Sequence, residues 1–522
     1  GDESRGHRFM SPEIFKVISK EQYLAQIKER FVILSADERE RMFVHSAEEK
    51  LKSINTRFNY DPDLMSIVRN IVEYPFVILG KFSEKYLKIP AEILVCEMKA
   101  HQKCFAVFDQ HGAIMPYFVC SAGTRPYDEQ IFAKGNERVL RARFEDGAFY
   151  YELDSQKTLA EHSKLLSTLI FERELGTVHD KSVRVEKLAM LLAEKFGVSK
   201  ADLDLIKESA PLLKADLTSG VVGQFPELQG VMGRIYAKND GLSAEVSEII
   251  ETHYWPRFAE DNLPRLKASA ILSMADRIDT ILGIIAIGKK PSGNKDPFAL
   301  RRAAIGVVRM ILGFGFSIDV KDMFSKASCG YKIDCQNAVF EAEEFLLQRA
   351  RGVLIEELSQ SSKEYAVNFA DSAFAAGSKD ILDIFARAQT LSDMRQKSPE
   401  FQTLVQTFKR ASNIVKKNHE SILTLNDELR NYLSLPVEKD LLKAVDDAAK
   451  MLDKKTQENS FKSLCESYSE KLKTISAIKP KLDAFFDNVM VMAKDEKLKS
   501  ARLAMLSDIK QIADKFGDFT HL

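Results

Sequence analysis

Four side chains could together bind a metal ion. His179 and Asp180 are adjacent, and Asp276 and Asp279 follow further along the chain. Adjacent His and Asp residues, completed by a distant His and Asp, can hold a divalent metal that activates water for phosphoester hydrolysis. Such a site needs a histidine ahead of the pair, and His162 is the nearest candidate. The alternative is that Asp180 opens a helix, because the helix dipole favours a carboxylate in the first turn.

A second candidate is a helix that we predict to begin at residue 401. At about 100° per residue, its apolar positions fall on one face: Phe401, Leu404, Val405, Phe408 and Val415. The opposite side carries Arg410, Asn413 and Lys417, flanked by Lys409 and Lys416. Cations around an amide suit contacts with the phosphates and base edges of a nucleic acid. The alternative is a charged helix face that meets only solvent.

Two other basic stretches permit more than one interpretation. Arg138, Arg141 and Arg143 follow a Gly-Asn pair at spacings of two to three residues, and such arginines often serve in packing and salt bridges. Further along, Lys and Gly residues precede the sequence Asp296-Pro297. They could cradle an anion at a helix start. We expect instead that Asp296 caps this helix and that Pro297 is its first residue.

The composition limits the classes of function. Lys and Arg total 75 against 76 Asp and Glu, a net charge of −1 that excludes a polybasic nucleic-acid binder but permits a local basic face. Six cysteines in 522 residues do not form a disulfide framework. The sequence contains no Gly-rich phosphate-binding loop and no Gly-x-Ser-x-Gly elbow. No apolar run reaches membrane-spanning length and no signal core opens the chain, so we expect a reducing, cytoplasmic location.

The elements that must position these residues divide the chain into an α+β part and a helical part. A β-hairpin is predicted between Lys103 and Ser121, and the charged stretch from Asp37 to Lys52 is predicted to be a helix. From residue 153 the apolar spacing is helical, apart from a loop predicted for 325–334. The predicted fold is mainly α and multidomain, with an α+β N-terminal region (1–152), a helical domain (153–300), a helical body (301–395) and a C-terminal helical bundle (396–522).

Several stretches together resemble one family, the beta subunit of the bacterial heterotetrameric glycyl-tRNA synthetase. They follow the family's order along the chain: Arg5-Gly-His-Arg-Phe9, Met98-Lys-Ala-His-Gln-Lys-Cys-Phe105, Gly135-Asn-Glu-Arg-Val139, Leu175-Gly-Thr177, Lys214-Ala-Asp-Leu217, Glu227-Leu-Gln-Gly-Val-Met-Gly233, Lys295-Asp-Pro-Phe-Ala-Leu-Arg-Arg302 and Phe485-Phe-Asp-Asn-Val-Met-Val-Met492. The resemblance covers essentially the whole chain, and it implies that the family extends upstream of the first of these stretches.

The resemblance also implies roles for the candidate residues. The family's middle region resembles the phosphohydrolase fold named after its His-Asp pair, but the metal positions align with Lys181 and with Lys214-Ala215, and only Asp276 is kept. A protonated lysine has no lone pair for a metal, so a degenerate, inactive domain is expected. From about Gln402 the chain resembles the anticodon-binding domain of arginyl-tRNA synthetase. The residues expected to contact tRNA are Lys409, Arg410, Asn413, Lys416 and Lys417, with Arg502 as a weaker candidate that could instead brace the bundle.

The function implied by the resemblance is that of a tRNA-binding subunit. The glycine-activating site of this family is on a separate alpha subunit, so no catalytic residue, metal or cofactor is expected on this chain, and ATP and Mg²⁺ are used by the whole enzyme. The implied partners are the alpha subunit and glycine tRNA, in an assembly of two alpha and two beta subunits that does not involve a membrane. The alternative function is a metal-dependent phosphohydrolase that uses His179, Asp180 and Asp276.

Overall fold

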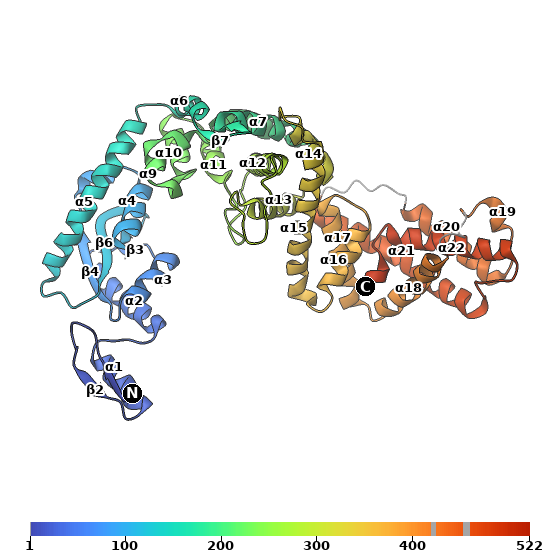
Figure 1. Ribbon diagram of the computed structural model, residues 1–522, viewed down its shortest axis with the longest axis horizontal. Coiled ribbons are helices and arrows are strands. Elements are labelled where there is room, and N and C mark those ends of the chain that lie inside the picture. Colours follow the sequence, from blue (N-terminus) through green and yellow to red (C-terminus); the bar gives the residue numbers. More distant parts are fainter. Residues whose placement is uncertain (1, 419–423, 453–459) are drawn as a thin grey trace. The chain divides into compact units, whose positions relative to one another are not determined.

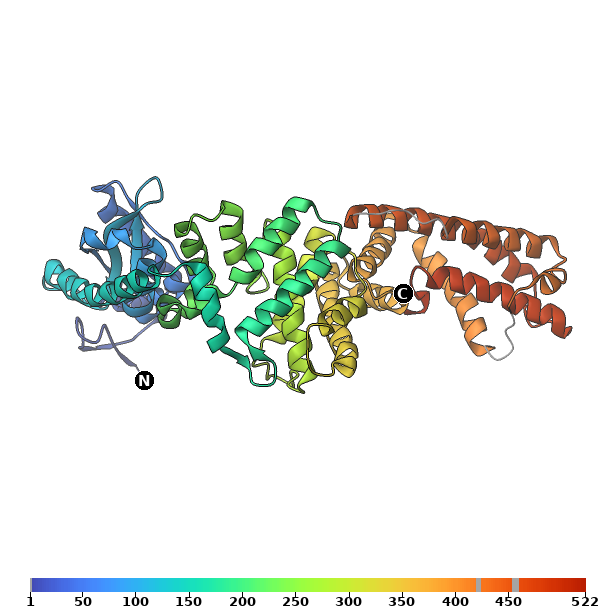
Figure 2. The same ribbon diagram turned by 90° about the horizontal axis from the view of Figure 1, so that it is seen from above.

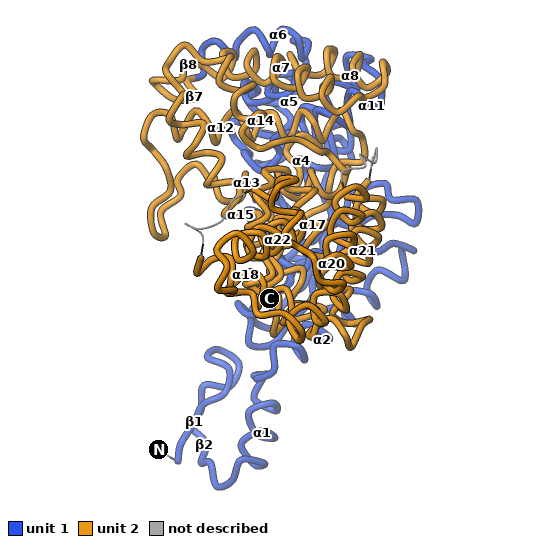
Figure 3. Tube along the Cα trace, turned by 90° about the vertical axis from the view of Figure 1, so that its right-hand side faces the viewer, with its two compact units in different colours: residues 1–169, 212–251 blue, residues 170–211, 252–522 orange. Residues whose placement is uncertain are grey.

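A computed structural model describes residues 2–418, 424–452 and 460–522. The chain forms two compact units, which Figure 3 shows in different colours. Unit 1 consists of residues 1–169 and 212–251, and unit 2 consists of residues 170–211 and 252–522. The prediction of a mainly helical chain with strands near its N-terminus is confirmed. The segment 153–300 contributes to both units, and the four predicted regions stay a prediction.

Unit 1 is built on a four-stranded antiparallel sheet with the strand order β3-β5-β6-β4. Its strands are β3 (Arg57–Phe58), β4 (Phe76–Lys81), β5 (Phe105–Phe108) and β6 (Ile114–Ala122). The predicted hairpin is confirmed as the β5–β6 pair, in which Phe105 faces Val119. Two helices, α2 (Ala36–Lys52) and α3 (Pro62–Ile71), bury apolar side chains against the sheet, Phe43 and Val68 among them. The helix predicted from the charged stretch is therefore confirmed as α2, which Ser35 caps.

Two further helices of unit 1 pack on the same domain, α4 (Ala91–Glu97) and α5 (Glu129–Asp154). Figure 1 shows α5 along the edge of unit 1, and it packs against both β4 and α4. On β4, Gly80 faces Phe118 of β6, and a Cβ at Gly80 would lie only 2.1 Å from the Phe118 ring. The absence of a side chain at Gly80 lets this ring cover the strand.

Shorter elements complete unit 1. The remaining ones are β1 (Glu3–Arg5), β2 (Ile14–Lys16), α1 (Lys20–Glu29), η1 (Glu84–Lys88), the π-helical turn η2 (Met98–Gln102), α6 (Leu159–Lys164), η3 (Leu165–Thr168), η5 (Ala215–Thr218), α9 (Gly220–Gln224), η6 (Pro226–Leu228), α10 (Val231–Asn239) and α11 (Ala244–Thr252, at the boundary).

The fully buried Asp216 carboxylate accepts the backbone N–H groups of Gly230, at 2.5 Å, and Gly233, at 3.2 Å. This contact fixes the start of α10, where Gly230 has a φ of +81°.

Unit 2 is organised around α12 (Lys267–Ala286), which is buried along nearly its whole length. The helices α7, α13, α14, α15 and α8 all contact it. The elements that precede the C-terminal bundle are β7 (Ile170–Glu172), β8 (Gly176–Thr177), α7 (Val178–Lys195), α8 (Lys200–Ser209), α13 (Leu300–Phe314), α14 (Val320–Ser328), α15 (Gln336–Ser362), α16 (Ala366–Ala375) and α17 (Ile381–Lys397). Within the described ranges, no helix has the length and apolar character needed to cross a membrane.

The C-terminal part of unit 2 is a bundle of long helices. Its elements are α18 (Phe401–Lys417), α19 (Asp427–Arg430), α20 (Pro436–Leu452), α21 (Phe461–Asn488), α22 (Glu496–Asp514) and the 3-10 turn η8 (Phe519–His521). Helix α20 packs on α21 and α22, and α18 packs on α21, α22 and η8. The long red helices in Figure 2 run side by side in this bundle.

Two predicted boundaries are wrong. The helix expected at Asp296-Pro297 begins only at Leu300, because Ala299 adopts a left-handed conformation with a φ of 53°. Asp296 nevertheless caps α13, since its carboxylate accepts the N–H groups of Leu300 and Arg301 at 2.9 Å. The loop predicted for 325–334 begins later than expected, because α14 continues to Ser328 after Asp319 caps its first turn.

The buried Asp216 carboxyl should make the stability of unit 1 depend on pH. Burial raises its pKa from 3.8 to about 6, against the opposing effect of the Gly230 and Gly233 N–H groups. The unfolded chain ionises this carboxyl more readily, so the free energy of unfolding should fall as the pH rises from about 4 to about 6, by roughly 3 kcal/mol in total. Asp216→Asn, which keeps an acceptor oxygen, should remove this decrease in urea unfolding measured across that pH range.

The matched control is Asp63→Asn, because Asp63 is an exposed carboxyl of the same unit. This control should keep the pH dependence of the unchanged protein. The same pH dependence in Asp216→Asn as in the unchanged protein would show that Asp216 is not the group responsible.

Candidate nucleic-acid interface

Helix α18 forms as the sequence predicts. All five of its predicted apolar positions are buried: Phe401, Leu404, Val405, Phe408 and Val415. These side chains pack against α21, α22 and η8, and the Phe408 ring meets that of Phe519 at a centroid distance of 5.6 Å. The buried stripe fixes the rotation of the helix about its axis, so the polar stripe faces away from the bundle.

Three predicted side chains of this polar stripe remain available to a ligand. Arg410, Asn413 and Lys417 are exposed, and within the described residues none of them forms an ion pair or a side-chain hydrogen bond. The Arg410 guanidinium lies 4.2 Å from the centre of the Phe486 ring. Stacking on an aromatic ring orders the guanidinium while leaving its N–H groups free to bind a phosphate. The spacing of three and four residues places the three side chains in one row along the helix.

The two flanking lysines contact the end of the chain. Lys409 donates a hydrogen bond to an oxygen of Leu522. Lys416 donates to Thr520 at 3.1 Å and lies 3.5 Å from a carboxylate oxygen of Asp518. Sequence reasoning missed these partners, because nothing in the spacing of α18 indicates that residues 518–522 fold back on it. Lys409 and Lys416 therefore hold the final turn in place beside the polar stripe of α18.

Arg502 lies in the interior of the bundle. Its Nε donates to Glu438 at 2.7 Å, and its Nη1 donates to the carbonyl of Met490 at 2.8 Å. The Arg502 side chain is 8% exposed and the Glu438 side chain is fully buried. This buried ion pair joins α22 to α20, which is the bracing role that the sequence left as the alternative for Arg502.

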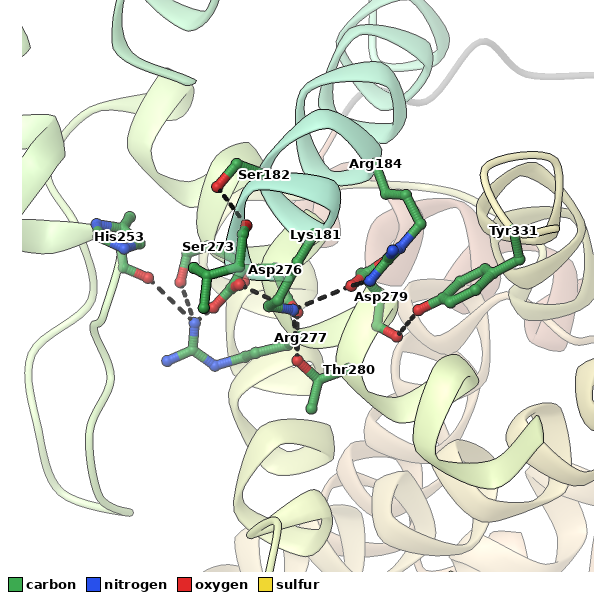
Figure 4. Close-up of polar contacts among 11 residues, drawn as sticks. Lys181, Ser182, Arg184, His253, Ser273, Asp276, Arg277, Asp279, Thr280 and Tyr331 are labelled. Atoms are coloured by element: carbon green, nitrogen blue, oxygen red, sulfur yellow. Dashed lines mark hydrogen bonds and ion pairs between the residues drawn. The ribbon is translucent and has the colours of Figure 1, made fainter. Parts of the chain in front are cut away.

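Lys181, which was expected from the resemblance to align with a metal ligand, supplies a cation to two carboxylates (Figure 4). Its ammonium lies 3.1 Å from Asp276 and 3.1 Å from Asp279, and it also donates to Thr280 at 2.7 Å. All four residues belong to α7 and α12 of unit 2. The ammonium group thus neutralises the acids that a metal ion would need as ligands.

A second buried cation completes this cluster. The Nε of Arg184 donates to Asp279 at 2.7 Å, and its guanidinium lies 4.4 Å from the centre of the Tyr331 ring. Burial disfavours the charged form of Arg184, but the carboxylate of Asp279 outweighs it and raises the pKa of the guanidinium. The Tyr331 hydroxyl donates to the carbonyl of Asp279 at 2.6 Å. The cluster therefore joins two cations and two acids between α7 and α12, and Tyr331 connects it to the residues after α14.

The histidine and aspartate pair of the metal hypothesis opens α7. Asp180 accepts the N–H and the hydroxyl of Thr177, both at 2.8 Å, and Thr177 accepts the Asp180 N–H in return. This capping box confirms the helix-start interpretation of Asp180. His179 is exposed on the first turn. His162 lies in unit 1, where its ring contacts the Thr218 hydroxyl at 3.0 Å. Across the described ranges, no group of three or more His, Cys, Asp or Glu side chains could hold a metal ion.

Unit 1 contains a cavity of 780 Å³ that could be mistaken for an active site. Lys99 and Asp61 line it and form an ion pair at 2.5 Å. Cys96 also lines it and donates its S–H to Glu227 at 3.1 Å. Burial and the Glu227 carboxylate raise the pKa of the Cys96 thiol, so the reactive thiolate is not formed at neutral pH. Cys96 is therefore not an activated nucleophile in this cavity.

Comparison with known sequences shows which proteins this chain is similar to. A profile described as glycyl-tRNA synthetase beta subunit matches residues 1–368, and one described as DALR anticodon binding domain matches residues 404–517. The glycine–tRNA ligase beta subunit of Syntrophomonas wolfei is 36% identical over 526 aligned residues, which span 99% of this chain and 73% of the relative. The chain belongs to the glycyl-tRNA synthetase beta-subunit family. Other relatives with the same name come from Desulfatibacillum aliphaticivorans, at 34% identity, and Coxiella burnetii, at 33%.

The two profiles cover different regions of unit 2. The anticodon-binding profile begins inside α18 and ends after α22, so it includes the polar stripe and the Arg502–Glu438 pair. The glycyl-tRNA synthetase beta-subunit profile includes the Lys181 cluster. Sequence reasoning placed Lys181 at the metal position but missed Arg184 and Tyr331, whose contacts with Asp279 join segments far apart in the chain. An arginine one turn after Lys181 on the same helix face was the available signal.

Lys181→Met should destabilise unit 2. The substitution leaves Asp276 and Asp279 side by side with one cation fewer, and loss of one partner of a buried ion pair costs about 3–5 kcal/mol. Thermal unfolding followed by circular dichroism should show a Tm lower by about 5 °C or more. Mn²⁺ should leave the Tm of the unchanged protein where it is, because an ammonium group occupies the acids.

The control is Lys187→Met, at an exposed position of the same helix, which should change the Tm little. Equal Tm values for the two variants, or stabilisation of the unchanged protein by Mn²⁺, would contradict the assignment of Lys181.

Proposed function

We propose that the C-terminal bundle binds the anticodon arm of glycine tRNA through the row Arg410, Asn413 and Lys417. The observation that supports this most directly is the coincidence of two facts. The anticodon-binding profile begins at residue 404, and the same helix presents these three side chains without protein partners among the described residues. Arg410 and Lys417 suit phosphate oxygens, and the Asn413 amide can both donate to and accept from a base edge. Lys409 and Lys416 add positive charge beside them while holding residues 518–522.

We further propose that this chain contributes position rather than bond chemistry to glycylation of the tRNA. Its partner is the alpha subunit, which activates glycine with ATP and Mg²⁺, in a cytoplasmic assembly of two alpha and two beta subunits. The chain presents the acceptor end of the bound tRNA to that site. Fixing the tRNA removes translational and rotational freedom before the reaction, which can lower the barrier by several kcal/mol. The ammonium-occupied cluster of unit 2 and the protonated thiol of unit 1 are consistent with this division of labour.

Arg410→Ala combined with Lys417→Ala should weaken binding of glycine tRNA and reduce its salt dependence. Each phosphate contact releases counterions, so removing two cations should lower the slope of log affinity against log salt by about 1.5. Fluorescence anisotropy with labelled tRNA between about 50 and 200 mM salt measures both quantities.

The matched control is Lys443→Ala with Lys450→Ala, which removes two exposed lysines from α20 in the same bundle. The control should keep most of the affinity and the slope. An unchanged slope in the Arg410 and Lys417 variant would exclude this row from the tRNA contact.

Changing the anticodon of glycine tRNA should weaken its binding to this chain by more than about 1.4 kcal/mol, a factor of ten. The bound tRNA would bury the Asn413 amide, and a changed base would leave this amide without a hydrogen-bond partner, which costs binding free energy. Equal affinity for both tRNAs would mean that the bundle contacts only the backbone, and Asn413 would then not read a base.

A further inference from the structure

The surface of α5 in unit 1 carries a second row of cations, which lies outside the residues matched by the anticodon-binding profile. Lys134, Arg138 and Arg141 are exposed and lie four and three residues apart, which places them on one side of the helix. Within the described residues, none of the three forms an ion pair or donates a side-chain hydrogen bond. We call this row the α5 ridge. Figure 1 shows α5 at the edge of unit 1, with β4 packed on its other side.

The acids of α5 near this ridge already have partners. Glu137 accepts the backbone N–H of Lys81 at 3.0 Å. Glu145 accepts the Tyr86 hydroxyl at 3.0 Å and pairs with Lys85 at 3.3 Å. Among the described residues these three cations form no ion pair, while the nearby acids pair with other groups, so the ridge has a net positive potential.

Arg143 shows the contrast within the same stretch. It lies 3.7 Å from Asp146 on its own helix, and it is less exposed than Arg138 and Arg141. The sequence left all three arginines open between salt bridges and ligand contact. The structure shows the salt bridge for Arg143, and within the described residues Arg138 and Arg141 form none.

The backbone of the ridge is open to close approach. Gly135 follows Lys134 directly, and no atom lies within 4 Å of the place where its Cβ would be. A glycine inside a helix costs about 1 kcal/mol relative to alanine, and packing inside the protein does not require one here. Beside it lie the exposed apolar side chains of Ile131 and Val139, at 67% and 40% exposure. A narrow strip of small and apolar groups beside a row of cations suits the sugar–phosphate backbone of an RNA helix, whose shallow groove presents ribose between phosphates.

We propose that the α5 ridge binds the phosphate backbone of the tRNA outside its anticodon arm. This inference rests on the proposed function, because it takes the tRNA as the polyanion. The anticodon arm is assigned to α18 in unit 2, whereas the ridge belongs to unit 1, so the two surfaces give the chain two separate RNA contacts. Phosphate contacts without base reading add affinity and orientation but no sequence preference.

The test compares two RNA probes with the full chain. One is a minihelix that carries only the acceptor arm of glycine tRNA, and the other is its anticodon stem-loop. Lys134→Ala with Arg138→Ala and Arg141→Ala should weaken minihelix binding at least tenfold and lower its salt slope by about two to three. Binding of the anticodon stem-loop should stay unchanged. A variant with Arg138→Lys and Arg141→Lys should keep the salt slope of the unchanged protein.

A charge-matched control removes three lysines of unit 1 that already have carboxylate partners, Lys28, Lys50 and Lys52. It should retain minihelix binding. An unchanged salt slope in the ridge variant, or an equal loss in the control, would overturn the proposal. So would a ridge variant that loses the alpha subunit but not the minihelix, because the ridge would then be a protein-binding surface. If neither RNA binds the unchanged chain, the proposed function itself fails, which is a different outcome from failure of the ridge alone.

Discussion

The burial of α12 is the constraint on which much of unit 2 depends. A helix that is covered on nearly all sides cannot leave a carboxylate without a counter-charge, and Asp279 is only 2% exposed. Lys181 and Arg184 meet this need from α7, and Tyr331 satisfies the Asp279 carbonyl from the segment after α14. The polar contacts therefore fix the register of α7 against α12, while apolar packing supplies most of the stabilisation. The ions at this place therefore serve the packing of α7 on α12.

The charged residues of this chain fall into two groups that differ in their surroundings. Interior cations such as Arg184 and Arg502 are held by carboxylates that are themselves buried. Surface cations on α18 and α5 lie beside acids that are already engaged, or beside no acids at all. The net charge of −1 does not show this difference, because it counts a cation paired with a carboxylate in the same way as an unpaired cation on the surface. Local geometry decides which lysines and arginines can meet a polyanion.

The sequence predicted those elements that depend on the pattern of residues within a single segment. The apolar stripe of α18, the helix α2 and the β5–β6 hairpin follow from periodicity within one segment, and the structure contains all three. The resemblance to a family drew attention to Lys181, and the structure shows its ammonium paired with Asp276 and Asp279. The contact of Lys409 with Leu522 and the burial of Arg502 against Glu438 could not be predicted, because each joins residues distant in the sequence. The start of α13 was misplaced for a different reason: the Asp296 carboxylate caps the helix from one turn away, which mimics an ordinary N-cap in the sequence.

The path of the chain between the two units has a consequence for how the protein can be divided. The chain leaves unit 1 after residue 169, returns at 212 and leaves again after 251. A single cut therefore cannot release either unit whole, since a fragment that ends at 169 lacks the segment that carries Asp216 and α10. During synthesis, unit 1 cannot be completed until residues 212–251 have emerged from the ribosome, by which time α7 and α8 of unit 2 have already been made. The segments of the two units are thus synthesised alternately, and separate expression of unit 1 requires its two segments to be joined by a new linker or supplied as two chains.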